Sequence, residues 1–335
     1  MAAARAFPPI EELEAGLVAG DRGLLSRAIT LIESSRAEHQ TLAEELLRRL
    51  QPRTGNAWRV GVSGVPGVGK STFIDVLGTR LTERGSRVAV LAVDPSSTVT
   101  GGSVLGDKTR MDRLSRDPHA FVRPTPGGDA TGGVALRSRE TMLLCEAAGF
   151  DVVLVETIGV GQAEVAVSHL VDTFVLLALA GAGDELQGIK RGIMELADVL
   201  VIHKADGDNA AAAERAGAES ASALRFLHHG RDGWQPPVLT ASAHEATGID
   251  DVWDAVRRHR AALGSTGLAE RRCEQALHWF EAAWQDLLRR EFLLNDDVAA
   301  RLPVLRDRVR RGERQPAAAA RDLLARGKDP HPPSA

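Results

Sequence analysis

The chain has 335 residues and a net charge of −4, with 44% hydrophobic and 26% charged side chains. This balance is typical of a globular protein and lacks the basic excess of a general nucleic-acid binder, so we expect no nucleic-acid partner. No apolar run is long enough to span a bilayer, the N-terminal residues fit neither a secretory signal nor a transit peptide, and Cys145 and Cys273 are too few for a disulfide framework or a zinc site. We therefore expect a cytoplasmic location and no membrane partner.

The predicted elements begin with a helical extension and continue into an α/β domain. In residues 1–57, Asp21 suits a helix N-cap, and apolar residues recur at helical spacing until Pro52. In residues 58–263, short runs rich in valine and leucine alternate with helical stretches. These runs are the expected strands: residues 59–63, 88–93, 120–123, 152–156, 173–179, 199–203 and 238–241. Buried strands separated by helices predict a mostly parallel, doubly wound sheet with ligands at the carboxyl ends of its strands.

A glycine-rich run follows the first strand and precedes a helix. It matches the phosphate-binding pattern of Gly, four residues, Gly-Lys-Ser/Thr, in which backbone N–H groups and a helix N-terminus surround the phosphates. Lys70 is expected to reach the β- and γ-phosphates, and the Ser71 hydroxyl to bind Mg²⁺. The expected nucleotide contacts are Gly64, Val65, Pro66, Gly67, Val68, Gly69, Lys70, Ser71 and Thr72.

Three carboxylates at strand ends or in loops are candidates for holding Mg²⁺ with Ser71. Asp94 follows the second strand, Asp107 lies in the glycine-rich loop after it, and Glu156 ends the fourth strand. Hard cations prefer such oxygen ligands. Glu156 and Gly159 also form the pattern of a γ-phosphate-sensing switch, in which the carboxylate orients Mg²⁺ and its water and the glycine N–H contacts the phosphate.

The run after the sixth strand is typical of guanine recognition. That motif is Asn-Lys-x-Asp, in which the Asp accepts hydrogen bonds from guanine N1 and N2, a donor pair that adenine lacks. Asp206 retains this role and Lys204 can lie along the base, but His203 replaces the Asn, so we expect guanine preference with weaker binding. Further along, Ser242 and Ala243 lie in a short loop of the kind whose backbone supports guanine O6.

After residue 263 the strands stop, and residues 264–328 are predicted to be helical. An apolar stripe runs along one helix: Leu277, Phe280, Trp284, Leu287 and Leu288. It could pack back onto the α/β domain or form a dimer contact, and both alternatives stay open at this point. Residues 329–335 are expected to be a disordered tail.

Four long stretches of this chain resemble one known family: residues 64–78, 90–111, 153–164 and 180–198. They resemble the MeaB family, also called the methylmalonyl-CoA mutase-associated or methylmalonic aciduria type A GTPases, of the SIMIBI class of dimerising P-loop proteins. The resemblance implies an α/β GTPase core flanked by helical N- and C-terminal extensions in a homodimer. It also implies a chaperone of an adenosylcobalamin-dependent acyl-CoA mutase, which gates cofactor loading from an adenosyltransferase and protects or reactivates the mutase.

The resemblance also implies roles for individual residues, with GTP or GDP and Mg²⁺ as the bound cofactors. The Mg²⁺ shell would be Ser71, Asp94, Asp107 and Glu156. Residues 183–190 resemble the family's third switch loop, which would bring Lys190 to the active site. The catalytic residues in this interpretation are Lys70, Glu156 and Lys190.

Two other functions remain open. A metal-insertion GTPase would need soft or imidazole ligands, but the chain has no Cys-x-Cys-Cys, Cys-Pro-His or histidine tract. A small-molecule kinase would use the same phosphate loop and would be favoured by use of ATP. Because no glutamine directly follows Gly159 to orient a water molecule, we expect slow intrinsic hydrolysis that a partner accelerates. The sequence does not specify which acyl-CoA mutase would be served.

Overall fold

The computed structural model describes residues 7–34, 36–93, 111–124, 133–157, 163–180, 191–227 and 233–326. The chain divides into two compact units, Met1–Ala276 and Leu277–Ala335. No helix among the described residues is long and apolar enough to cross a membrane.

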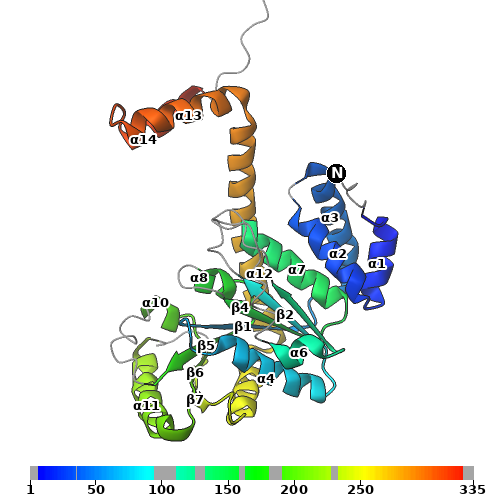
Figure 1. Cartoon of the computed structure of the whole chain (residues 1–335), viewed down its shortest axis with the longest axis vertical. Coiled ribbons are helices and arrows are strands. Elements are labelled where there is room, and N and C mark those ends of the chain that lie inside the picture. Colours follow the sequence, from blue (N-terminus) through cyan, green and yellow to red (C-terminus); the bar gives the residue numbers. More distant parts are fainter. Residues whose placement is uncertain are drawn as a thin grey trace, which may run out of the picture. The chain divides into compact units, whose positions relative to one another are not determined.

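The described part of the first unit contains one sheet of seven parallel strands (Figure 1). The strands are β1 (Trp58–Gly64), β2 (Val88–Val93), β3 (Ala120–Pro124), β4 (Val152–Thr157), β5 (Thr173–Leu179), β6 (Val199–His203) and β7 (Val238–Ala241). Their order is β3-β2-β4-β1-β5-β6-β7, so all seven predicted strands and the parallel, doubly wound topology are confirmed. The chain leaves the central strand β1 to build the sheet on both sides, which makes the carboxyl end of β1 the point where a ligand binds in this architecture.

Helices cover both faces of the sheet. The described residues of the two units together form the helices α1 (Ile10–Val18), α2 (Arg22–Glu33), α3 (Ala37–Leu50), α4 (Lys70–Glu83), α6 (Asp112–Arg116), α7 (Gly133–Ala147), α8 (Ala163–Ser168), α10 (Arg191–Met194), α11 (Ala210–Leu227), α12 (Ile249–Leu294), α13 (Asp296–Arg310) and α14 (Pro316–Arg326), with short 3₁₀ turns at Gln51–Arg53 and Gly207–Asn209.

Alternate residues of β1 face the two layers of helices. Val60 lies in a buried cluster with Phe73 of α4 and Val256 of α12. Gly61 faces the other way, and a Cβ added there would lie only 2.9 Å from Val167 of α8. This alternation follows from the period of two in a strand, and the missing side chain at Gly61 allows α8 to pack closely on the sheet.

The helices α1, α2 and α3 form the predicted N-terminal helical extension. The Asp21 carboxylate caps α2 by accepting hydrogen bonds from the N–H groups of Gly23 at 2.7 Å and Leu24 at 3.0 Å, as the sequence predicts. The extension lies beside α7 (Figure 1), and an ion pair of 2.8 Å between Glu33 of α2 and Arg123 of β3 ties it to the sheet. The extension is therefore attached to the α/β domain through its packing beside α7 and through this ion pair.

The second unit contains the end of α12 together with α13 and α14. Helix α12 is not regular throughout, because Gly264 has a φ of +63° and introduces a kink. Asn295 caps α13 by accepting hydrogen bonds from the N–H groups of Asp297 and Val298 at 3.0 and 3.3 Å. The predicted apolar stripe is exposed: Leu277 61%, Phe280 64%, Trp284 42%, Leu287 57% and Leu288 61%. The division of the chain at residues 57, 263 and 328 stays a prediction.

Candidate nucleotide-binding site

The glycine-rich run forms the turn between β1 and α4, at the carboxyl end of the central strand. Gly64 has a φ of +152°, and a Cβ added there would overlap the carbonyl oxygen of Leu177 on β5. Gly69 has a φ of +99°, in the left-handed region, and immediately precedes α4. Only glycine adopts both conformations without steric cost, so this backbone path requires these residues.

Lys70 is the first residue of α4, and its side chain folds back over the loop. Its Nζ donates hydrogen bonds to the carbonyl oxygens of Gly64 at 2.8 Å and Val65 at 3.4 Å. The side chain is largely buried, with 9% of the residue exposed. A cation held across the mouth of a helix N-terminus is suited to binding the phosphates of a nucleotide.

Ser71 and Glu156 meet beside this lysine although 85 positions separate them in the chain. The Ser71 hydroxyl donates a hydrogen bond of 2.7 Å to Oε1 of Glu156, whose carboxylate lies near the end of β4 and is 4% exposed. Below this pair, a hydrogen bond of 2.9 Å joins the hydroxyls of Ser63 and Thr157 and fixes the neighbouring strand ends. The two members of the predicted Mg²⁺ shell that the structure describes are thus adjacent.

The spacing of these two oxygens fits Mg²⁺. Oxygens bound at right angles at 2.0–2.1 Å from one Mg²⁺ ion lie about 3 Å apart. The observed 2.7 Å between the Ser71 and Glu156 oxygens therefore requires only a small opening to admit the ion. Among the residues that the structure describes, no group of three His, Cys, Asp or Glu side chains could hold a metal. The other predicted ligands, Asp94 and Asp107, lie outside the described residues, as do Gly159 and Lys190.

The predicted guanine loop follows β6, two strands away from β1. Asp206 accepts a hydrogen bond from the hydroxyl of Ser242, and the same hydroxyl accepts one of 3.1 Å from the N–H of Glu245. Lys204 has a φ of +58°, and its carbonyl oxygen accepts a hydrogen bond of 2.6 Å from the side chain of Asn209. The loop is thus held in place by side chains from both of its flanks.

His203 lies between the phosphate loop and the loop after β7. Its Nδ1 is 2.7 Å from the carbonyl oxygen of Val68, and the N–H of Ala243 donates to its Nε2 at 3.3 Å. The residue is only 2% exposed, and its ring makes an edge-to-face contact with Phe73 of α4. Burial, which penalises the charged imidazolium, lowers the pKa of His203 below its ordinary value, with the nearby Lys204 ammonium acting in the same direction.

Sequence reasoning missed several residues that shape this site. Phe73, Ser63 and Thr157 read as ordinary core or strand residues, because the sequence does not show which of their neighbours meet in space. Asn209 was also missed, since no local motif indicates the hydrogen bond from its side-chain amide to the backbone of the guanine loop.

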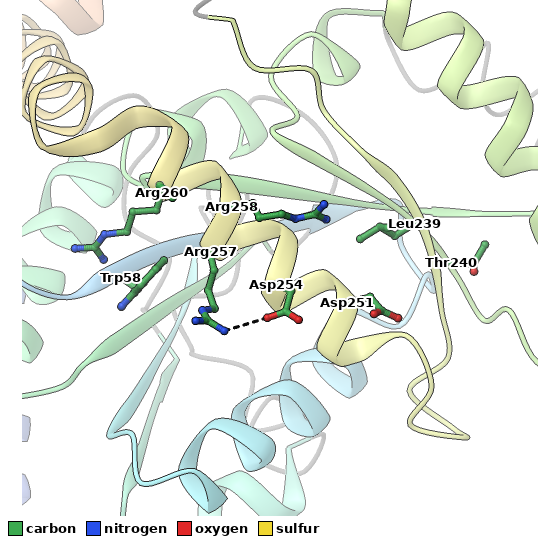
Figure 2. Close-up of a pocket in the computed structure, with 9 residues that line it drawn as sticks. Trp58, Leu239, Thr240, Asp251, Asp254, Arg257, Arg258 and Arg260 are labelled. Atoms are coloured by element: carbon green, nitrogen blue, oxygen red, sulfur yellow. Dashed lines mark hydrogen bonds and ion pairs between the residues drawn. The ribbon is translucent and has the colours of Figure 1, made fainter.

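A separate cavity of about 970 Å³ lies along α12 and β7, and none of the predicted site residues lines it. Figure 2 shows Trp58 and Arg260 at one side of α12 and Leu239 at the other. The guanidinium of Arg260 lies 4.2 Å from the centre of the Trp58 ring. Since Trp58 begins β1 and Gly64 ends it, this cavity belongs to the strand's opposite end and is distinct from the nucleotide site.

The parallel sheet carries a glycine-rich loop at the end of its central strand, with a lysine at the start of the following helix. A Lys-x-Asp loop lies on the same edge of the sheet. These features together define a P-loop protein of the GTPase type. The family model described as methylmalonyl Co-A mutase-associated GTPase MeaB matches residues 25–297, and the chain belongs to this family.

Relatives along nearly the whole chain agree with this assignment. A Caulobacter vibrioides protein named as a GTPase is 54% identical over 94% of this chain and 97% of its own length. The methylmalonic aciduria type A homolog of Mus musculus, a mitochondrial protein, is 44% identical over 96% of this chain and 80% of its own length. A crystal structure of a protein named LAO/AO transport system kinase superposes with a TM-score of 0.73 at 39% identity, covering 94% of this chain and 96% of that one.

Proposed function

We propose that this protein binds GTP or GDP with Mg²⁺ and hydrolyses GTP slowly to GDP and phosphate. The observation that carries the proposal is the 2.7 Å contact between Ser71 and Glu156 beside Lys70, on the same edge of the sheet as Asp206. These residues supply the separate parts that a GTPase needs, namely a phosphate cradle, cation ligands and a base-reading carboxylate. Family membership supports the same activity, because the matching family is described as a GTPase.

Each predicted site residue discussed below has a chemical task in this proposal. Mg²⁺, when bound with the nucleotide, neutralises charge that builds on the phosphate oxygens. Ser71 and Glu156 would hold it through their oxygens. When a nucleotide binds, the Lys70 ammonium would leave the carbonyl oxygens of Gly64 and Val65 and donate its hydrogen bonds to the β- and γ-phosphates instead. Asp206, oriented by a bond from the Ser242 hydroxyl, accepts from guanine N1 and N2.

The remaining roles fall on residues outside the described part of the chain. Asp94 and Asp107 would complete the Mg²⁺ shell, Gly159 would contact the γ-phosphate, and Lys190 would approach the active site from the third switch loop. In the proposed nucleotide-dependent switch, contacts with the γ-phosphate and Mg²⁺ would distinguish the GTP-bound protein from the GDP-bound protein.

We further propose that hydrolysis serves an adenosylcobalamin-dependent acyl-CoA mutase, whose cofactor loading the protein gates and which it protects or reactivates. The description of the matching family as mutase-associated supports this partner. An adenosyltransferase that supplies the cofactor would be the second partner. The slow GTPase would then act as a timer whose output is a protein–protein event.

The test is steady-state phosphate release from GTP and from ATP, with Mg²⁺, in the presence and absence of a purified adenosylcobalamin-dependent acyl-CoA mutase from the same source. We expect slow GTP turnover that rises several-fold with the mutase, and little ATP turnover. In a Lys70→Ala control, both the basal and the mutase-stimulated GTP turnover should be lost. GTP turnover that no mutase changes would remove the chaperone proposal and leave the GTPase. Equal use of ATP would favour a small-molecule kinase, the kind of activity for which the similar crystallised protein is named.

We propose that the apolar stripe of α12 forms a homodimer contact. Leu277, Phe280, Trp284 and Leu287 follow one another at intervals of three and four, and Leu288 lies four residues after Trp284. All five are exposed on one helix face, which is typical of a helix–helix interface. Leu287→Glu should convert the dimer to a monomer in sedimentation or light scattering. Arg289→Gln changes the charge by the same amount about 160° around the helix from Leu287 and should leave the dimer intact. A monomeric wild-type protein at micromolar concentration would exclude the proposal.

We also propose a cytoplasmic location. Cys145 and Cys273 are both free thiols, and Cys273 is exposed, as suits a reducing compartment.

A further inference from the structure

Both ring nitrogens of His203 are bonded to backbone groups, and these belong to two different loops. Nδ1 contacts the carbonyl oxygen of Val68 in the phosphate loop at 2.7 Å. Nε2 contacts the N–H of Ala243, in the loop after β7, at 3.3 Å. The ring therefore spans the gap between the segment that would hold the phosphates and the segment that would support the base.

The chemistry of these partners fixes the protonation state of the ring. A carbonyl oxygen only accepts hydrogen bonds, so Nδ1 must carry the proton, while an amide N–H only donates, so Nε2 must be bare. The ring is accordingly a neutral imidazole with one tautomer. Its burial, with 2% of the residue exposed, favours the same neutral form.

Packing also restricts the position of the ring. A Cβ added to Gly69 would lie 2.9 Å from Cε1 of His203 and 3.8 Å from Cε of Lys204. The edge-to-face contact with Phe73 closes another side. The imidazole is thus wedged against the left-handed glycine that directly precedes Lys70.

With both nitrogens bonded to backbone, the ring has no hydrogen-bonding atom left for a base. The side chain that usually occupies this position in the Asn-Lys-x-Asp motif is shorter, and its amide nitrogen could reproduce only the bond from Nδ1 to Val68. The presence of His in place of Asn therefore does not imply weaker guanine binding. The ring makes the bond to Val68 that an Asn side chain could make, and it adds the bond to Ala243.

We propose that His203 is a positioning residue that joins the phosphate loop to the loop after β7 and makes no contact with the base. This inference rests on the proposed GTP site. Its consequence is that the two halves of the nucleotide pocket keep one relative geometry through a single side chain. Removing the ring leaves the Val68 carbonyl and the Ala243 N–H without these partners, and each lost bond is expected to weaken nucleotide binding on the order of tenfold.

The test measures binding of GDP and 7-deaza-GDP to the wild type, His203→Leu and His203→Asn by calorimetry. The deaza analogue lacks N7, the acceptor that a base-contacting side chain would use. We expect His203→Leu to lose on the order of 10- to 100-fold in affinity for both ligands equally. We expect His203→Asn to recover part of the loss through its bond to Val68. If instead the wild type alone discriminates the two ligands, His203 contacts the base and the proposal is wrong.

Amide hydrogen exchange supplies a second readout that needs no nucleotide. In His203→Leu, the Ala243 amide should exchange faster, because its bond to Nε2 is gone. The Thr247 amide, bonded to the carbonyl of Ser242 at 3.0 Å in the same loop, is the internal control and should change little. Unchanged exchange at Ala243 would overturn the proposal, as would unchanged GDP affinity in His203→Leu. Absence of GDP binding by the wild type would instead refute the proposed function.

Discussion

Replacing Glu140 of α7 by glutamine should stabilise the protein above neutral pH and have a much smaller effect at pH 5. Burial raises the pKa of this carboxyl from its ordinary value of 4.5 to about 7, and the nearby Arg137 and Arg139 only partly offset the cost of burying its charge. In the window between these two pH values, the folded protein keeps a proton that the unfolded chain has lost. Stability should therefore fall as pH rises from about 4.5 to about 7.

The magnitude follows from the same two values. At 1.36 kcal/mol for each pH unit, the gap between 4.5 and about 7 corresponds to about 3 kcal/mol as an upper limit. Glutamine has the shape of the protonated carboxyl and does not titrate. Below the unfolded-state pKa of 4.5 the two proteins should therefore be nearly equal in stability, at pH 5 they should differ by less than about 1 kcal/mol, and by pH 8 Glu140→Gln should be more stable by up to the full amount.

The assay is urea unfolding of both proteins at pH 5, 6, 7 and 8, followed by circular dichroism. The quantity of interest is the difference in free energy of unfolding between variant and wild type, which cancels the groups that they share. Glu38→Gln, at an exposed position of α3, controls for the loss of one carboxylate at the surface. A difference at Glu140 that stays constant from pH 5 to pH 8 would refute the reasoning, because the buried carboxyl would then be ionised throughout.

Three further substitutions test the site and its support. Gly69→Ala should reduce nucleotide affinity more than tenfold, because the added Cβ would lie 2.9 Å from the imidazole of His203. Gly67→Ala is the control for backbone strain alone, since Gly67 has a φ of +77° and an added Cβ would have nothing within 4 Å. Equal losses of affinity in the two variants, measured by calorimetry, would show that the contact with His203 is unimportant. In the wild type the buried guanidinium of Arg59 pairs with Glu146 at 2.6 Å. Glu146→Ala removes this counter-charge and should lower the free energy of unfolding by about 3–5 kcal/mol. A loss below about 1 kcal/mol in urea unfolding would contradict this prediction. Asp206→Asn should weaken GTP binding on the order of a hundredfold and improve binding of xanthosine triphosphate, whose base offers an acceptor where guanine has an amino group. If competition binding shows an unchanged preference for GTP over xanthosine triphosphate, Asp206 takes no part in base recognition.

The fold could be predicted closely from local patterns in the chain. Strands such as β2 (Val88–Val93) and β6 (Val199–His203) begin and end at the predicted residues, because runs of valine and leucine buried on both faces are visible in a single segment. The phosphate loop is equally local, since its glycines and lysine lie within one turn. Helix α12 was harder to predict, because it continues through residue 263 and only Gly264 interrupts it.

The amino-acid sequence by itself determined the parallel α/β architecture and the position of the glycine-rich loop, and it indicated Asp206 as the proposed base-reading carboxylate, because each is encoded by neighbours along the chain. Only the tertiary structure decided which distant groups meet. It placed Ser71 against Glu156 at 2.7 Å and gave Asp206 the hydroxyl of Ser242. It also gave both nitrogens of His203 to backbone groups of other loops. A hydrogen bond depends on the position and direction of both partners, and for residues separated by a whole strand and helix these are fixed only when the sheet has assembled.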